Sequence, residues 1–171
     1  GKDAGVHVSS FADDTKVAAG VHNPQDAQIL QQSLNSIYSW AADSNMVLNG
    51  TKFHLLRYGA SADLKTSTFY TDNLGQKIEE SSWVPDLGIN MSSDGSYSSH
   101  ITELAQKANN MCGWVLRTFR SREPRSMLLL YKSLILSQLD YCSALWNPSL
   151  TSWLCNKLES IQRSSTRKID G

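Results

Sequence analysis

The segment Gly5-Val-His-Val-Ser-Ser-Phe-Ala-Asp-Asp-Thr-Lys-Val-Ala-Ala-Gly-Val-His22 decides the fold of the first half of the chain. Side chains 6, 8 and 10 alternate with side chains 7, 9 and 11, which is the period of a β-strand, and residues 15–21 form a second extended stretch. Asp13 and Asp14 lie between them, and paired acids are poor strand residues but favourable turn residues. The segment therefore predicts a β-hairpin with two carboxylates at its tip.

A helix is expected directly after this hairpin. Asn23 is a favourable N-cap, Pro24 suits the first helical position and Asp26 places an acid in the first turn. Apolar residues then share one helical face at Ala27, Leu30, Leu34, Ile37, Tyr38 and Ala41. Further extended stretches are expected at 46–48 and 53–58 around an Asn49-Gly50 turn, at 68–71 and 76–79, and as one strand at 83–91. Residues 1–95 therefore predict an α+β layer, an antiparallel sheet with a helix on one face.

The pattern changes near residue 96, where three helices are expected. Apolar residues keep helical spacing over 101–119, from Pro124 to about residue 142, and over 153–161. The charge changes at the same place. Residues 1–95 hold 6 Lys+Arg and 11 Asp+Glu, a net charge of −5, whereas residues 96–171 hold 10 and 5, a net charge of +5. A basic half joined to an acidic one suggests a polyanionic partner for the helical half.

The composition excludes several classes of protein. The 171 residues suffice for one compact domain or two small ones, and 40% hydrophobic with 19% charged residues is ordinary for a globular protein. The longest apolar run, 127–131, is far shorter than the roughly 20 residues of a membrane span. Cys112, Cys142 and Cys155 form no metal or disulfide pattern, which favours reduced thiols in an intracellular protein. The chain has no initiator Met, signal peptide or transit peptide, so we expect a piece of a longer protein.

The hairpin also carries a family resemblance. Phe11-Ala-Asp-Asp-Thr15, with a strand on each side, resembles the aromatic-x-Asp-Asp catalytic motif of reverse transcriptases. Other short segments follow in the order found in the reverse transcriptases of non-LTR retrotransposons, the LINE-like elements of the jockey type. They are Leu30–Asn35, Trp40, Leu48-Asn49, Lys52, Asp86–Ile89, Ser99–Ile101, Leu116-Arg117, Asp140–Ser143, Trp146–Pro148 and Leu158–Arg163. Each segment is weak alone, but together they cover nearly the whole chain in one order.

The resemblance implies an RNA-directed DNA polymerase that copies retrotransposon RNA into DNA by two-metal nucleotidyl transfer. Residues 1–95 would be the C-terminal part of the polymerase palm, and residues 96–171 the helical thumb and its continuation. Asp13 would be a ligand of the catalytic Mg²⁺ ions (or Mn²⁺), Asp14 would assist beside it, and Lys52 would lie near the triphosphate and neutralise or protonate the leaving pyrophosphate. The partners would be template RNA, primer DNA and dNTPs. The alternatives are a solvated turn for the two aspartates and a surface lysine for Lys52.

Two basic clusters are candidates for contact with a phosphate backbone. The first spans an expected helix end and contains Arg117, Arg120, Arg122 and Arg125; the second lies on the last helix and contains Arg163, Arg167 and Lys168. The alternatives are arginines that complement the dipole at a helix C-terminus, for part of the first cluster, and a solvated helix face for the second.

A polymerase of this kind also needs a further palm aspartate and the fingers, which this sequence lacks and which would precede residue 1. We therefore expect the 171-residue chain alone to be inactive. The longer protein would act in the nucleus, where target-primed reverse transcription occurs, and in a cytoplasmic ribonucleoprotein. Two alternatives stay open: a non-catalytic nucleic-acid-binding remnant of a retrotransposon polyprotein, with the helical half as its working part, and a chain that folds poorly without the upstream strands of the palm.

Overall fold

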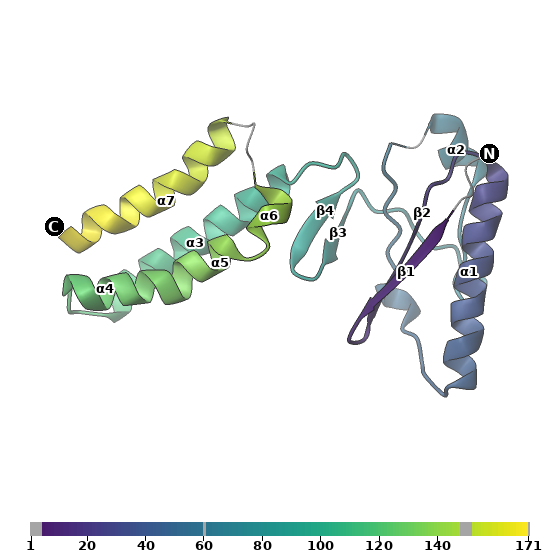
Figure 1. Ribbon diagram of the computed structural model, residues 1–171, viewed down its shortest axis with the longest axis horizontal. Coiled ribbons are helices and arrows are strands. Elements are labelled where there is room, and N and C mark those ends of the chain that lie inside the picture. The colour runs from purple at the N-terminus through teal and green to yellow at the C-terminus, as the bar shows by residue number, and fades with distance from the viewer. Residues whose placement is uncertain (1–4, 60, 148–151, 171) are drawn as a thin grey trace. The chain divides into compact units, whose positions relative to one another are not determined.

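Figure 1 shows the computed structural model of the chain, which describes residues 5–59, 61–147 and 152–170, with the side chains of all of these except 152 and 168–170. Helices and two small antiparallel sheets make the fold α+β, as the sequence predicts. The chain divides into two compact units, residues 1–84 and 85–171. The division precedes the pattern change at residue 96, and it gives the two units net charges of −3 and +3.

The first unit begins with the predicted hairpin. Strands β1 (Val6–Phe11) and β2 (Asp14–Ala19) pair antiparallel, with Val6 opposite Ala19 and Phe11 opposite Asp14. Ala12 and Asp13 form the two-residue loop, in which Ala12 has a φ of 52°. Positive φ at the first loop residue alone is the mark of a type II′ turn, whose twist matches that of the strands it joins. The hairpin prediction is confirmed, with Asp14 as the first residue of β2.

Helix α1 (Pro24–Asp43) packs beside this hairpin (Figure 1). Its start is fixed by two reciprocal hydrogen bonds, because the Asn23 side chain accepts the Asp26 N–H at 2.9 Å and the Asp26 carboxylate accepts the His22 N–H at 2.8 Å. The predicted apolar face of α1 is buried against both strands and the segment that follows. The cluster contains Ala27, Leu30 and Tyr70 at its centre, with Val6, Val17, Ala19, Val21, Leu34, Leu55 and Ile78 around them.

The predicted second hairpin, around Asn49-Gly50, is wrong. Residues Gly50–Lys52 form a 3₁₀ helix, η1, and the Asn49 side chain caps it by accepting the N–H of Thr51 at 3.1 Å and its hydroxyl at 2.7 Å. Such local hydrogen bonds of an asparagine compete with strand pairing. Among the described residues of 46–58, Leu55 alone forms a bridge, a parallel one with Glu80. Lys52 consequently ends a 3₁₀ turn and does not lie on a strand.

A turn at residues 72–75 joins the two stretches expected at 68–71 and 76–79, which are reduced to one bridge, Thr71–Lys77. The Asp72 carboxylate accepts the N–H groups of Leu74 and Gln76 at 2.9 and 2.8 Å, which holds the turn closed. The preceding segment contains the short helix α2 (Ala62–Ser67).

The single strand predicted at 83–91 is instead a hairpin of β3 (Trp83–Asp86) and β4 (Ile89–Ser92). Leu87 and Gly88 both have positive φ, 48° and 84°, which is the conformation of a type I′ turn. Ile89 of β4 is buried with Ile101, Trp146 and Leu154. Because β4 belongs to this cluster, the second unit begins before the helices do.

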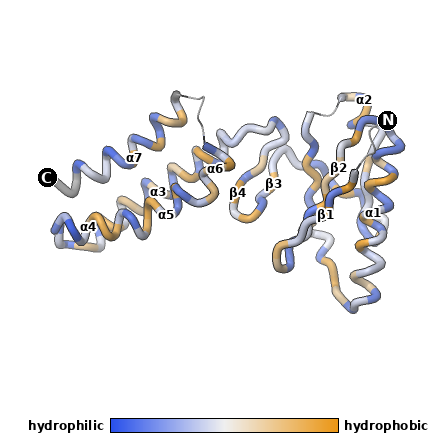
Figure 2. Tube along the Cα trace, in the orientation of Figure 1, coloured by the Kyte–Doolittle hydropathy of each residue, from blue (hydrophilic) through white to orange (hydrophobic). Residues whose placement is uncertain are grey.

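The second unit contains the three predicted helical stretches. The first is α3 (Ser98–Thr118). The second is a nearly continuous run made of α4 (Pro124–Leu130), the π-helix η2 (Tyr131–Leu136) and α5 (Ser137–Asp140). The third is α7 (Ser152–Asp170), and the short helix α6 (Ser143–Trp146) lies between α5 and α7 in the sequence. Their shared core contains Ala105, Ala108, Val115, Met127, Tyr131, Ile135 and Ile161. Figure 2 shows apolar positions alternating with hydrophilic ones along these helices. None of the described helices combines the length and hydropathy needed to cross a bilayer.

We predict that acid weakens the second unit through His100. This histidine is buried, accepts the Asn90 N–H at 3.3 Å through Nδ1 and packs against Trp146. Burial lowers its pKa below the ordinary value of 6.5, although the nearby Glu103 carboxylate opposes this and Lys107 adds to it. The unfolded chain therefore binds the proton more readily, so His100 contributes stability above about pH 6.5 that is lost as the pH falls through the lowered pKa.

Urea unfolding at a series of pH values between 7.5 and 5 checks this prediction. His100→Asn should flatten the loss of stability on the acid side, whereas the exposed His54, changed to Asn, should leave it as it is. An equal acid slope in the wild type and in His100→Asn would contradict the assignment.

Candidate metal and nucleic-acid sites

The two predicted metal ligands lie at the tip of the first hairpin. Asp13 is the second loop residue and Asp14 opens β2 opposite Phe11, and both carboxylates are exposed. Just behind the tip, the hydroxyls of Ser10 and Thr15 lie 3.1 Å apart across the strands and tie them together. The hairpin thus presents two carboxylates, which are hard oxygen ligands, on a short turn.

Two carboxylates fit Mg²⁺ in part. Mg²⁺ prefers six oxygen ligands and is commonly held by one or two carboxylates together with substrate phosphates and waters. Over the described residues there is no group of three or more His, Cys, Asp or Glu side chains that could hold a metal. The tip can therefore anchor a divalent cation, and the remaining ligands must come from another polypeptide segment, a nucleotide or water.

Lys52 is exposed at the end of η1. No hydrogen bond or ion pair joins it to Asp13 or Asp14 in the described part of the chain. Its role near a triphosphate stays a prediction, and the exposed ammonium group leaves it available for one.

The arginines of the first cluster separate into different roles. Arg122 donates from Nη2 to the Leu116 carbonyl at 2.6 Å and from Nη1 to the Phe119 carbonyl, so its guanidinium caps the C-terminus of α3. Arg117 lies along α3 over Gly113, because a Cβ placed at Gly113 would be 3.1 Å from Nη1 of Arg117. Arg120 and Arg125 are exposed. Within the described residues, Arg57 and Arg163 are the only arginines whose guanidinium groups form an ion pair with a carboxylate.

The second basic cluster is partly engaged in a local ion pair. Arg163 lies 2.5 Å from the Glu159 carboxylate, one helical turn earlier on α7, and both side chains are largely exposed. Arg167 is exposed, and the side chain of Lys168 lies outside the described residues. This arrangement agrees with the solvated-face alternative for Arg163 and leaves Arg167 as the available charge.

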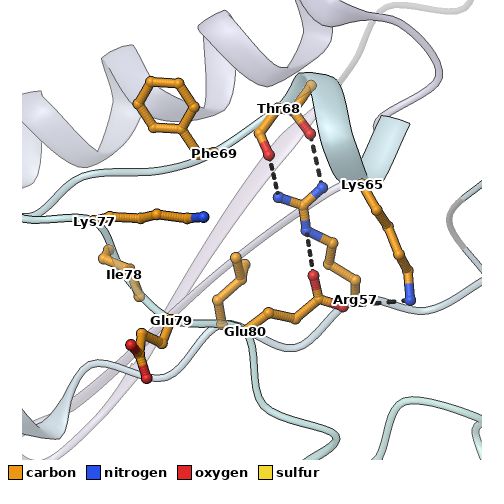
Figure 3. Close-up of a pocket in the computed structure, with 9 residues that line it drawn as sticks. Arg57, Lys65, Thr68, Phe69, Lys77, Ile78, Glu79 and Glu80 are labelled. Carbon is orange, nitrogen blue, oxygen red and sulfur yellow. Dashed lines mark hydrogen bonds and ion pairs between the residues drawn. The ribbon is translucent and has the colours of Figure 1, made fainter. Parts of the chain in front are cut away.

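The structure also brings together a group that the sequence analysis missed. In the first unit, an open hollow of about 340 Å³ is lined by Leu55, Arg57, Lys65, Thr68, Phe69, Lys77, Ile78, Glu79 and Glu80 (Figure 3). The Arg57 side chain is one of its lining groups and is only 11% exposed. It donates from Nη1 to the Thr68 hydroxyl at 2.7 Å and from Nη2 to the Thr68 carbonyl at 2.8 Å.

The same guanidinium holds two further partners. Its Nε lies 3.3 Å from the Glu80 carboxylate, an ion pair without the alignment of a hydrogen bond, and its Cζ lies 5.4 Å from the centre of the Tyr70 ring. Lys65 reaches the other Glu80 oxygen at 3.4 Å. Burial raises the pKa of Tyr70, and the nearby Arg57 charge opposes that rise. Because these residues have no regular spacing, the sequence carried no signal for this cluster. Its contacts within the first unit indicate a structural role.

Comparisons of the chain with models of protein families, with curated proteins and with solved structures gave no match. Support for a function therefore comes from the residues themselves and from the geometry described above.

We predict that Arg57→Met destabilises the first unit by about 1–3 kcal/mol, because it removes the hydrogen bonds of a largely buried guanidinium to Thr68 and to the Leu64 carbonyl. Lys65→Met likewise removes a positive charge from the Glu80 carboxylate, but Lys65 is 42% exposed. It should cost within about 0.5 kcal/mol. Urea unfolding of both variants measures the difference, and equal losses would refute the buried role of Arg57.

Arg122→Ala should destabilise the second unit by about 1 kcal/mol, since it uncaps the carbonyls at the end of α3. Arg125→Ala removes an equal charge from the next helix and should stay within about 0.5 kcal/mol of the wild type. Thermal unfolding followed by helical circular dichroism distinguishes the two. An unchanged midpoint for Arg122→Ala would show that the cap contributes nothing.

Proposed function

We propose that this chain is part of an RNA-directed DNA polymerase of the non-LTR retrotransposon type, with the first hairpin in its palm and the helical stretch from residue 96 as its thumb. The observation that carries the proposal is the tight β1–β2 turn of Phe11-Ala-Asp-Asp-Thr15, which presents Asp13 and Asp14 to solvent. A metal site benefits from this pair of carboxylates, because adjacent like charges are relieved by a divalent cation.

The chain's own residues would have distinct roles in this chemistry. Asp13 would offer a carboxylate oxygen as metal ligand, and Asp14, on β2, would add negative charge beside it. Mg²⁺ bound there, or Mn²⁺, would supply activation of the primer 3′-hydroxyl and stabilisation of the leaving pyrophosphate. Lys52 would bring positive charge to the phosphates of the incoming dNTP. Template RNA and primer DNA would be held by the basic helical residues.

Two carboxylates do not complete a two-metal site, so further ligands must come from polymerase segments that this sequence does not contain. We therefore propose that the 171-residue chain alone does not extend a primer. An assay of the chain with primed RNA, dNTPs and Mg²⁺ is the direct test, and Asp13-dependent extension would overturn this part of the proposal.

A second candidate function is nucleic-acid binding without catalysis. It is favoured by Arg117, Arg120 and Arg125, which lie at the α3–α4 junction and whose guanidinium groups form no ion pair with a carboxylate of the described residues. Phosphate contacts by such arginines supply affinity that is independent of sequence and falls with salt. Binding to nucleic acid with a steep salt dependence and no metal dependence would favour this candidate.

Asp13→Asn tests the catalytic proposal in the longer polymerase polypeptide that the proposal implies. It keeps the size of the side chain and removes its charge, so primer extension on an RNA template should fall by more than about 100-fold, the loss typical of damaging a metal site. The matched control is Asp43→Asn, an equally exposed aspartate at the end of α1. Extension that survives Asp13→Asn, or that falls equally with Asp43→Asn, would reject Asp13 as a metal ligand.

A further inference from the structure

An aromatic pair stands exposed at the C-terminal end of α3. The ring centres of Trp114 and Phe119 lie 6.2 Å apart at an interplanar angle of 83°, an edge-to-face contact. Trp114 remains 47% exposed and Phe119 37% exposed, whereas their neighbour Val115 is buried in the bundle core. The pair therefore packs on itself and leaves aromatic surface open to solvent.

This pair is held in place by the helix cap. Arg122 binds the carbonyl of Phe119 and, at 2.6 Å, that of Leu116, so the segment after α3 is fixed by two hydrogen bonds. The ring of Phe119 is thereby kept beside Trp114. A rigid aromatic surface binds with less loss of conformational entropy than a mobile one.

Two arginines are close neighbours of these rings in the sequence. Arg117 lies one helical turn after Trp114 on α3, and Arg120 directly follows Phe119. Residues 117–125 contain four arginines and one acid, Glu123, whose carboxylate accepts the N–H groups of Arg125 and Ser126 at 3.0 and 2.6 Å. The acid is thus occupied as the N-cap of α4, and the surface around the rings keeps a net positive charge.

We propose that Trp114 and Phe119 form a stacking platform for unpaired bases of single-stranded nucleic acid, with Arg117 and Arg120 at its phosphates. Exposed aromatic rings stack on bases of any sequence, and arginines contact the phosphates of the backbone. Proteins that bind single strands combine these two kinds of contact. A duplex fits less well, because its bases are already stacked on one another. The inference rests on the nucleic-acid-binding part of the proposed function and names the form of the ligand.

The test measures binding of a labelled 12-nucleotide oligo(U) and of an RNA–DNA duplex to the full chain at several salt concentrations. Trp114→Ala should weaken oligo(U) binding by about 5- to 150-fold, the range of one lost stacking contact, without changing the slope of log affinity against log salt. Arg120→Ala should instead lower that slope by about 0.7, the value for one phosphate contact of a single strand. Trp153→Ala, an equally exposed tryptophan on α7, is the matched control and should bind normally.

Two conservative variants distinguish the loss of an aromatic ring from misfolding of the chain. Phe119→Leu keeps apolar volume and should lose affinity as Trp114→Ala does, whereas Trp114→Phe keeps a ring and should retain most of it. The platform is overturned by unchanged oligo(U) binding in Trp114→Ala, by an equal loss in Trp153→Ala, by tighter binding of the duplex, or by no binding of oligo(U) to the wild type. These results are independent of Asp13-dependent primer extension, so the platform and the polymerase proposal can fail separately.

Discussion

The contact of α1 with the β1–β2 hairpin is the interaction on which the candidate metal site depends. A two-stranded hairpin is marginally stable in water, and this one has no third strand among the described residues. Ala27 and Leu30 of α1 cover one of its faces together with Tyr70, and the Asn23–Asp26 capping bonds set where that helix begins. With the strands held from one side, the tip bearing Asp13 and Asp14 is left to solvent.

The arginines of this protein differ in what their guanidinium groups contact. Arg57 is largely buried and contacts Thr68, Glu80 and Tyr70, so it holds loops of the first unit together. Arg122 is exposed, yet its guanidinium is occupied by the carbonyls at the end of α3. Arg120, two residues earlier, makes no such contact. A count of positive charges therefore overstates how many arginines are available to contact a phosphate backbone. Their hydrogen-bond partners show which guanidinium groups are already occupied.

The second unit depends on one aromatic residue that links its parts. Trp146 is buried with Ile89 of β4, Ile101 of α3 and Leu154 of α7, and its indole N–H donates to the Tyr141 carbonyl at 2.9 Å. The Tyr141 hydroxyl in turn donates to the Leu87 carbonyl at 2.8 Å, in the turn that joins β3 to β4. Strand β4 is thereby packed with the helices, which moves the unit boundary ahead of the change in sequence pattern.

Local sequence signals were sufficient to predict the β1–β2 hairpin with its two aspartates, the capped start of α1 and the three helical stretches of the second unit. Alternation, capping residues and helical spacing act over a few residues, so they can be recognised without a structure. Other features depend on contacts between segments that are distant in the sequence. Asn49-Gly50 suits a hairpin turn or an asparagine-capped 3₁₀ turn equally well, and the absence of a pairing partner for 46–48 selected the second among the described residues. The Arg57–Glu80 cluster and the Trp114–Phe119 surface depend on side chains meeting through the packed fold, a constraint that sequence spacing does not record.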